Sequence, residues 1–226
     1  SYRATLERIE QMQRKSGRRG GRVLHIGMSA NDFRADGKGG TVGLSEDFDA
    51  TIFRYPVCDA IADGVLVPPV GLKIETARSQ LIAQKYLEHA AGRHALAFCC
   101  DVQHAHDLTA AMRAEGIAAH AVWGAMPDRQ RADIIGRYKE GDPSVQVLCS
   151  RDLLFEGFDA PVCAAILQAR PTQSAVIALQ MPGRGLRLYP GKSDCLVLSF
   201  TDRGLELTVD VEQSLVDGED EQAGSR

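Results

Sequence analysis

Short apolar runs alternate with amphipathic segments along the chain from Val70 onward. The runs are nearly continuous rather than interrupted at every second position, which is typical of strands that are covered on both faces. The pattern predicts five such strands, at residues 95–100, 117–122, 145–149, 164–168 and 195–200.

The segments between the runs carry the signals of helices. Asp101 is a suitable N-cap for a helix whose apolar residues recur on one face, and Gly116 is placed to end it. Pro127 opens a second helix, which Gly-Asp-Pro at 141–143 stops. A third helix is predicted over residues 172–183. Strands joined by helical crossovers predict an α/β fold with a doubly wound parallel sheet, and ligands of such sheets bind at the carboxyl ends of the strands.

The first 68 residues follow a different pattern. A helix over 2–13 leads into a basic loop, and a single strand is predicted over 23–26. One strand flanked by loops cannot bury a core of its own. We therefore expect residues 1–68 to be the end of a domain that begins upstream, residues 69–205 to form a complete α/β domain, and residues 206–226 to be a disordered acidic tail.

The composition is that of an ordinary soluble protein, with 44% hydrophobic and 25% charged residues. No apolar run reaches the ~18 residues that a membrane span needs, and the start of the chain has no signal-peptide pattern. We therefore expect a soluble protein inside the cell with no membrane partner, and the cytoplasm is favoured over an organelle or the nucleus. Six cysteines form no CxxC pair, which favours buried reduced thiols over a metal site.

Acidic residues are concentrated at the end of the chain. Residues 204–226 hold seven acids and one base, whereas the whole chain has 30 acids and 26 bases. The remainder therefore has 25 bases and 23 acids, a net charge of +2. This balance is compatible with a nucleic-acid partner.

The most informative stretch runs from Gln180 to Arg187. Arg184 and Arg187 are three residues apart and Gln180 is four residues before the first, so a helical turn would place all three on one side. Two planar guanidinium forks that point the same way suit phosphate oxygens. The alternative is a surface arginine pair bound to carboxylates. Gly183 and Gly185 argue against it, because a plain surface helix would use alanine at these positions.

A second polar stretch, residues 150–161, directly follows a predicted strand. Ser150 and Arg151 stand at the end of that strand, where a parallel sheet binds ligands. Gly157 permits a tight turn that would direct Asp159 into the same cleft.

Five segments resemble, in this order, the later motifs of superfamily-two helicases: residues 29–31, 98–99, 124–131, 156–159 and 180–187. The resemblance covers nearly all of residues 23–200. It looks closest to the DEAD/DEAH-like group that includes restriction-enzyme translocating subunits and the related repair and mitochondrial helicases. In that family, two RecA-like domains clamp ATP with Mg²⁺ between them and move along a nucleic acid. The resemblance implies a RecA-like helicase C-terminal domain, preceded by the end of the first RecA-like domain of the same parent chain, with DNA favoured over RNA as the partner.

The resemblance also implies a role for each matching residue. The arginine fingers that reach the γ-phosphate of ATP would be Arg184 and Arg187, and Gln180 would help to close the cleft. Further residues at the nucleotide would be Gly157, Asp159 and Gly183. The positions that face the nucleic-acid backbone would be Gly124, Arg131, Ser150 and Arg151. The coupling motif at the end of the first domain would be Ser29, Ala30 and Asn31.

The chain also departs from the family pattern. A GxxxxGK[ST] phosphate loop and an acidic metal-binding motif are both absent, so we expect this chain alone to be inactive, with ATP bound mainly by an upstream part of the parent. The Gly-Lys-Ser stretch at 191–193 is rejected as a phosphate loop, because its spacing is wrong and it enters a strand. A non-catalytic module that binds nucleic acid or a protein partner is the alternative function, which is motivated by the departures at Asn31, Arg151 and Pro182.

The aromatic and imidazole side chains allow more than one interpretation. Trp123, beside Gly124, could stack on a base, which is worth ~1–3 kcal/mol, or pack at the end of a strand. His104 and His106 are two residues apart on a predicted helix and point to different sides, so we expect ordinary surface residues rather than metal ligands.

Overall fold

The chain divides into two compact units, residues 1–54 and 55–226, in a computed structural model. The described residues are 33–35, 41–43, 52–53, 55–76, 78–154, 158–170, 181 and 183–201. The domain boundaries expected from the sequence remain a prediction.

In the first unit, the structure describes one antiparallel hairpin. Strand β1 (Phe33–Ala35) pairs with β2 (Thr41–Gly43). Neither strand was predicted, since three residues are too few for a hydrophobic period to be recognised. The helix expected over 2–13 and the strand expected over 23–26 lie outside the described residues.

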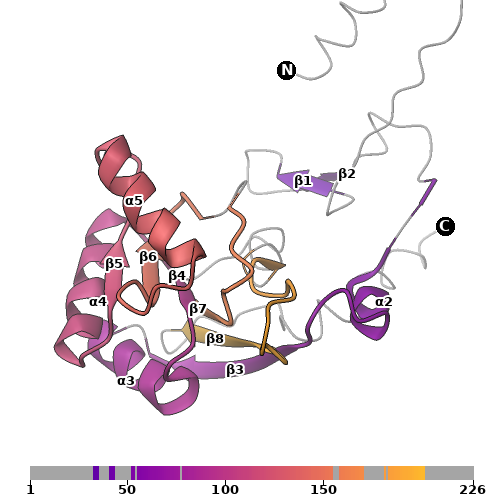
Figure 1. The fold of residues 1–226 in the computed structure, drawn as a ribbon, viewed down its shortest axis with the longest axis horizontal. Helices are drawn as coiled ribbons and strands as arrows, with labels where there is room; N and C mark the ends of the chain where they lie inside the picture. Colours follow the sequence, from indigo (N-terminus) through magenta and orange to yellow (C-terminus); the bar gives the residue numbers. More distant parts are fainter. Residues whose placement is uncertain are drawn as a thin grey trace, which may run out of the picture. The chain divides into compact units, whose positions relative to one another are not determined.

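The second unit contains a six-stranded sheet in which every neighbouring pair of strands runs parallel (Figure 1). Its strands are β3 (Pro69–Glu75), β4 (Ala95–Cys99), β5 (Ala119–Ala121), β6 (Val147–Ser150), β7 (Ala165–Ala169) and β8 (Cys195–Thr201). The order across the sheet is β3-β8-β7-β4-β6-β5. The five strands predicted from the apolar runs are confirmed, and β4, β6 and β7 are buried along their whole length.

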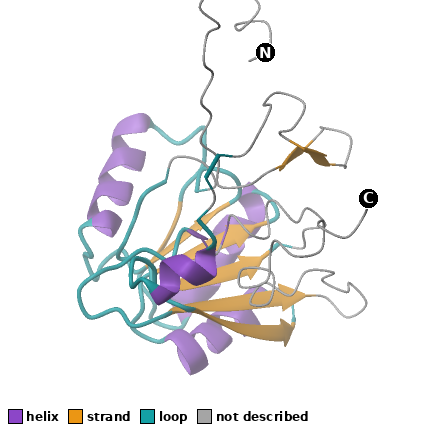
Figure 2. Ribbon diagram, turned by 90° about the vertical axis from the view of Figure 1, so that its right-hand side faces the viewer, coloured by secondary structure: helices purple, strands orange, loops and turns teal. Residues whose placement is uncertain are grey.

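Helices cover both faces of the sheet (Figure 2). On one face, α3 (Ser79–Ala90) packs beside α4 (Val102–Ala114), and both share an apolar cluster with Phe200 of β8. On the other face, α5 (Asp128–Lys139) shares a second cluster with Leu148 of β6. The predicted doubly wound fold is therefore confirmed. No helix in the described part of the chain is long and apolar enough to cross a lipid bilayer.

Local residues explain where α4 begins and ends and where α5 begins. The Asp101 carboxylate accepts a hydrogen bond from the backbone N–H of His104 at 2.7 Å. Gly116 follows α4 with a φ of 78°, a conformation that glycine adopts without strain. Pro127 stands directly before α5, as expected from the sequence. These boundaries could be predicted because each depends on a local residue preference.

Three elements of this unit were not predicted: α2 (Val57–Ala62), β3 and α3. β3 lies at the edge of the sheet, and its exposed Gly71 and Lys73 alternate with half-buried residues, so no continuous apolar run marks it. Of the helix predicted over 172–183, only Met181 and Gly183 are described, and both are helical.

Candidate functional site

Arg187 lies in the loop before β8, close to the segment that leads into β3. Leu66 forms an antiparallel bridge with Arg187, and the N–H of Val67 donates to the carbonyl of Leu186 at 2.9 Å. The Arg187 guanidinium forms an ion pair with Asp159. Both side chains of this pair are exposed, at 41% and 63% respectively, so the pair is open to solvent.

This ion pair lies on the side of the sheet where the strands begin. Leu66, which bridges Arg187, lies shortly before Pro69, the first residue of β3. The N–H of Cys195, the first residue of β8, donates to the carbonyl of Pro68 at 3.0 Å. The sequence placed ligands, and the cleft that Asp159 was expected to enter, at the carboxyl ends of the strands, whereas Asp159 and its partner Arg187 lie near the amino ends. Parallel strands force the chain to return to the amino ends after β6 and again after β7. Asp159 and Arg187 lie on these two return segments.

Arg184 is half-buried and approaches the same segment as Arg187. Its Nη1 donates to the backbone carbonyl of Phe158 at 3.4 Å. The structure therefore brings Arg184, Arg187 and Asp159 together, three residues that the sequence assigned to the nucleotide. Gln180 and Gly157, assigned to the same site, lie outside the described residues.

The two glycines beside the arginines differ in their surroundings. Gly183 is exposed, and a Cβ atom added there would meet no atom within 4 Å. A Cβ atom on Gly185 would lie 2.2 Å from the Sγ of Cys195 and 3.3 Å from the Cγ1 of Ile166. Close packing against β7 and β8 thus explains Gly185, which the sequence interpretation had related to ligand binding.

The ammonium group of Lys192 connects the two return segments. These contacts were not predicted from the sequence. The Lys192 Nζ donates to the backbone carbonyls of Cys163 at 2.6 Å, Arg187 at 2.7 Å and Pro161 at 3.2 Å. Burial lowers the pKa of this ammonium group. Because the ammonium is used on protein carbonyls, the structure agrees with the rejection of residues 191–193 as a phosphate loop.

The residues predicted to face nucleic acid lie at the carboxyl ends of the strands. Gly124 follows β5, and Ser150 is the last residue of β6. Arg131, in the first turns of α5, donates through Nη1 to the carbonyls of Gly124 at 2.8 Å and Met126 at 3.1 Å, and it also pairs with Asp128. Its side chain is 24% exposed. Arg131 thus fixes the loop that carries Gly124.

Ser150 and Arg151 differ in exposure although they are neighbours. Ser150 is 1% exposed, and its Oγ is buried without a hydrogen-bond partner among the residues that the structure describes. The Arg151 side chain is 52% exposed and pairs with Asp152 through Nε at 3.1 Å. Of the two polar groups, the Arg151 guanidinium is the one presented to solvent.

Helix α5 contacts both groups of predicted site residues. Its first turns hold Arg131, and its last turn places Tyr138 and Lys139 against Phe158. The Tyr138 and Phe158 ring centroids are 6.3 Å apart, and the Lys139 Nζ lies 5.3 Å from the Phe158 ring. Since Asp159 follows Phe158 in the chain, one helix runs from the Gly124 loop to the segment that pairs with Arg187.

The packing interpretation of Trp123 is favoured by its surroundings. The indole is half-buried against both apolar clusters, and the ring of His106 meets it edge-on at 4.7 Å between centroids. His104 accepts a hydrogen bond from the N–H of Cys100 through Nδ1, and burial lowers its pKa. Within the described ranges, no group of three or more His, Cys, Asp or Glu residues could hold a metal ion.

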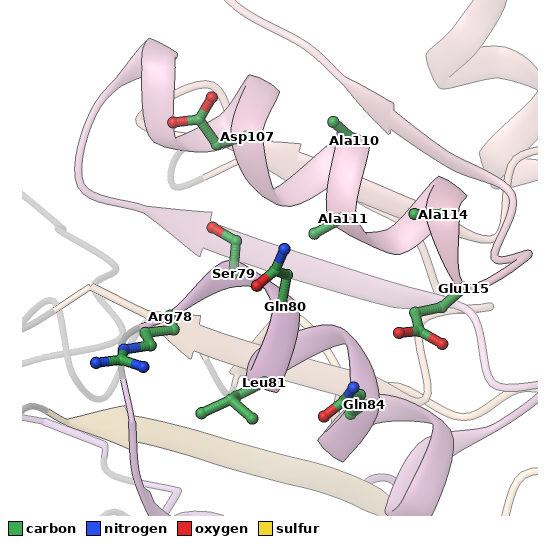
Figure 3. Close-up of a pocket in the computed structure, with 10 residues that line it drawn as sticks. All are labelled: Arg78, Ser79, Gln80, Leu81, Gln84, Asp107, Ala110, Ala111, Ala114 and Glu115. Carbon is green, nitrogen blue, oxygen red and sulfur yellow. The ribbon is translucent and has the colours of Figure 1, made fainter.

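A shallow groove lies between α3 and α4, on the face of the sheet opposite α5 (Figure 3). It has a volume of about 850 Å³, with Ala110, Ala111 and Ala114 on the α4 side and Arg78 and Gln84 on the α3 side. None of the described site residues lines this groove. The coupling residues Ser29, Ala30 and Asn31 lie outside the described part of the chain.

Residues 75–189 match the family model described as the helicase conserved C-terminal domain. A Schizosaccharomyces pombe protein named as the mitochondrial ATP-dependent helicase irc3 is 33% identical over 241 residues, which cover 95% of this chain and 38% of the relative. The fragment structure of an HsdR subunit of a type I restriction enzyme from Vibrio vulnificus is 24% identical, with a TM-score of 0.63 over 76% of this chain and 38% of that one. The Type ISP restriction-modification enzyme LlaBIII bound to DNA is 18% identical, with a TM-score of 0.53 over 80% of this chain and 15% of that one.

Proposed function

Because the chain belongs to the helicase C-terminal domain family, we propose that it is the second motor domain of an ATP-dependent helicase or translocase that acts on nucleic acid. The chain spans 38% of the length of its S. pombe relative, which leaves room in such a protein for the partner domain. A first RecA-like domain of the same polypeptide would bind most of the ATP and the Mg²⁺ ion. The similarity to LlaBIII, whose structure holds DNA, favours DNA over RNA as the partner.

The observation that carries the proposal is the exposed ion pair between Arg187 and Asp159, with Arg184 on the same loop. Exposed ion pairs contribute only ~0–1 kcal/mol, so the guanidinium can exchange its carboxylate for another anion at little cost. A phosphate offers more negative charge and accepts two parallel hydrogen bonds from a guanidinium. Described residues of this chain therefore fit the phosphate end of a nucleotide.

When bound, ATP supplies the phosphoryl group that is transferred to water. Arg184 and Arg187 would stabilise the negative charge that develops on this group, a contribution of ~10³–10⁵-fold in rate for arginine fingers. Asp159 would pair with Arg187 until the nucleotide arrives. Gly183, exposed and without a side chain, would let a phosphate approach the backbone. We assign Gln180 and Gly157 to the same cleft.

The nucleic-acid side of the proposal uses the carboxyl ends of β5 and β6. Arg151 would contact a backbone phosphate of the nucleic acid. Ser150, at the same strand end, is assigned to the same nucleic-acid-binding surface. Arg131 would act through the Gly124 loop that it fixes, rather than by direct contact. We assign Ser29, Ala30 and Asn31 to the coupling of the two motor domains.

One observation favours the alternative of a non-catalytic binding module. The structure pairs Arg187 with a carboxylate and commits Arg131 to the backbone of its own loop, so both guanidiniums have partners within the chain. A module of this kind would bind nucleic acid or protein and would not depend on Arg184 or Arg187 for ATP turnover.

Arginine substitution in the full-length protein distinguishes these functions. Arg184→Ala and Arg187→Ala should each reduce ATP turnover by ~10³-fold or more while ATP binding changes little. The matched control is Arg137→Ala, because Arg137 is 40% exposed and pairs with Asp142 at 2.9 Å, much as Arg187 pairs with Asp159. Turnover unaffected by either finger substitution would contradict the motor proposal. Robust ATP hydrolysis by the 226-residue chain alone would contradict the assignment of ATP binding to another domain.

A further inference from the structure

The ammonium group of Lys192 joins two segments that are distant in the sequence. Two of its acceptors, the carbonyls of Pro161 and Cys163, belong to the segment that follows Asp159. The third acceptor is the carbonyl of Arg187 itself, at 2.7 Å. Lys192 therefore holds the backbone on both sides of the ion pair between Asp159 and Arg187.

Lys192 anchors the backbone that carries the Arg187 guanidinium. The ion pair with Asp159 is exposed, so it fixes the two side chains only weakly. The three bonds of Lys192 are partly buried and charge-assisted, and hydrogen bonds to a charged group are about twice as strong as neutral ones. The bonds of Lys192 are therefore a stronger link between the Asp159 and Arg187 segments than the exposed ion pair.

The chemistry of Lys192 is specific to a primary ammonium. Its three N–H bonds point in three directions and match three carbonyl acceptors, whereas a planar guanidinium presents its donors in a fixed fork. A methionine of similar length would keep the packing of the stem but would leave three carbonyls without this donor.

We propose that Lys192 is a positioning residue for ATP hydrolysis, which holds the Arg187 and Asp159 segments at the spacing that a phosphoryl group requires. The inference rests on the proposed motor function. Lys192 does not touch the nucleotide in this role and acts through the backbone of Arg187.

The first test measures the site without ATP turnover. In the 226-residue chain, Lys192→Met should shift or broaden the Nε–Hε NMR signal of Arg187, because the guanidinium loses its fixed position. The corresponding signal of Arg137 should stay unchanged, since that side chain pairs with Asp142 and not with either return segment. An Arg187 signal that is unaffected by Lys192→Met would overturn the proposal.

The second test separates positioning from stability in the full-length protein. Lys192→Met should lower kcat for ATP hydrolysis by about 10- to 100-fold, the scale of a misplacement near 1 Å, with the KM for ATP within about twofold of the parent value. Lys192→Arg, which keeps the charge, should restore part of the lost kcat. The matched control is Asp194→Asn, which removes the ion pair of the same loop with Arg93 and should keep kcat.

Each outcome of the second test has a definite meaning. Two outcomes would overturn the role of Lys192, provided that Arg187→Ala still abolishes turnover. One is a wild-type kcat in Lys192→Met. The other is an equal loss of kcat in Lys192→Met and Asp194→Asn at equal thermal stability. If Arg187→Ala has no effect either, the proposed function fails, and the failure is not specific to Lys192.

Discussion

The two ends of the sheet hold their arginines in different ways. At the carboxyl ends, Arg131 is 24% exposed and donates to two backbone carbonyls. At the amino ends, Arg187 is 41% exposed and pairs with an exposed carboxylate. A guanidinium bonded to the backbone stabilises the loop around it, whereas a solvated ion pair contributes little and can be exchanged. One arginine is part of the scaffold, and the other forms only a solvent-exposed ion pair.

The largest expected loss of stability comes from a substitution in the loop before β8, at the amino ends of the strands. Gly185→Ala should lower the free energy of unfolding by about 1–3 kcal/mol, because its Cβ would lie 2.2 Å from the Sγ of Cys195 and overpack the core. Gly183→Ala is the matched control and should stay within about 0.5 kcal/mol of the parent, since its Cβ meets open space. Denaturant unfolding of the 226-residue chain measures both.

A double substitution sharpens this test. Cys195→Ala removes the sulfur that the new methyl group would meet, so Gly185→Ala should cost less in the Cys195→Ala background than in the parent. Additive effects of the two substitutions would show that the contact with Cys195 is not the cause.

The scaffold role of Arg131 predicts a smaller but clear effect at the carboxyl ends. Arg131→Ala should lower the free energy of unfolding by about 1–2 kcal/mol, because the carbonyls of Gly124 and Met126 lose their charged donor. Arg187→Ala should change it by less than about 1 kcal/mol, since only an exposed pair is lost. The comparison between the two ends would be wrong if thermal denaturation ranked the variants in the opposite order.

The smallest expected effect is a loss of stability in acid. It depends on carboxyl groups that lie near the amino ends of the strands. Hydrogen bonds from Ser144 and Arg137 lower the pKa of Asp142, and a hydrogen bond from Arg93 lowers the pKa of Asp194. A carboxyl group with a lowered folded-state pKa stabilises the protein above its unfolded pKa of about 4. That contribution is lost as the pH falls from there towards the folded-state pKa.

Thermal unfolding between pH 5 and pH 2 measures this loss. Asp194→Asn should reduce the steepness of the decline, because one of the carboxyl groups with a lowered pKa is removed. A decline as steep in Asp194→Asn as in the parent would show that Asp194 does not contribute.

The sequence predicted those parts of the fold that depend on local patterns. Buried central strands appeared as apolar runs, and α4 was bounded by Asp101 and Gly116, which act within a few residues. β3 was missed because an edge strand is half exposed and lacks such a run. Local sequence patterns therefore predicted an element reliably only where both faces of a strand are buried or where a capping residue bounds a helix.

The candidate site was harder to predict because its contacts are long-range. The motif spacing identified Arg184, Arg187 and Asp159, which the structure brings together. The sequence did not reveal that they lie at the amino ends, since this depends on where the return segments meet. Lys192 was missed for a similar reason: its acceptors are backbone carbonyls as far as 31 residues away, and a carbonyl carries no sequence signature.

The order of the strands has a consequence for how this protein is made. β8, the last strand of the sheet, lies between β3 and β7, and β3 pairs with β8 alone among the described strands. About 120 residues separate the end of β3 from the start of β8, so a nascent chain exposes an unpaired β3 until nearly the whole unit has left the ribosome. Translation that stops before Cys195 leaves two open strand edges, and such truncated chains should aggregate or be degraded rather than persist as partial domains.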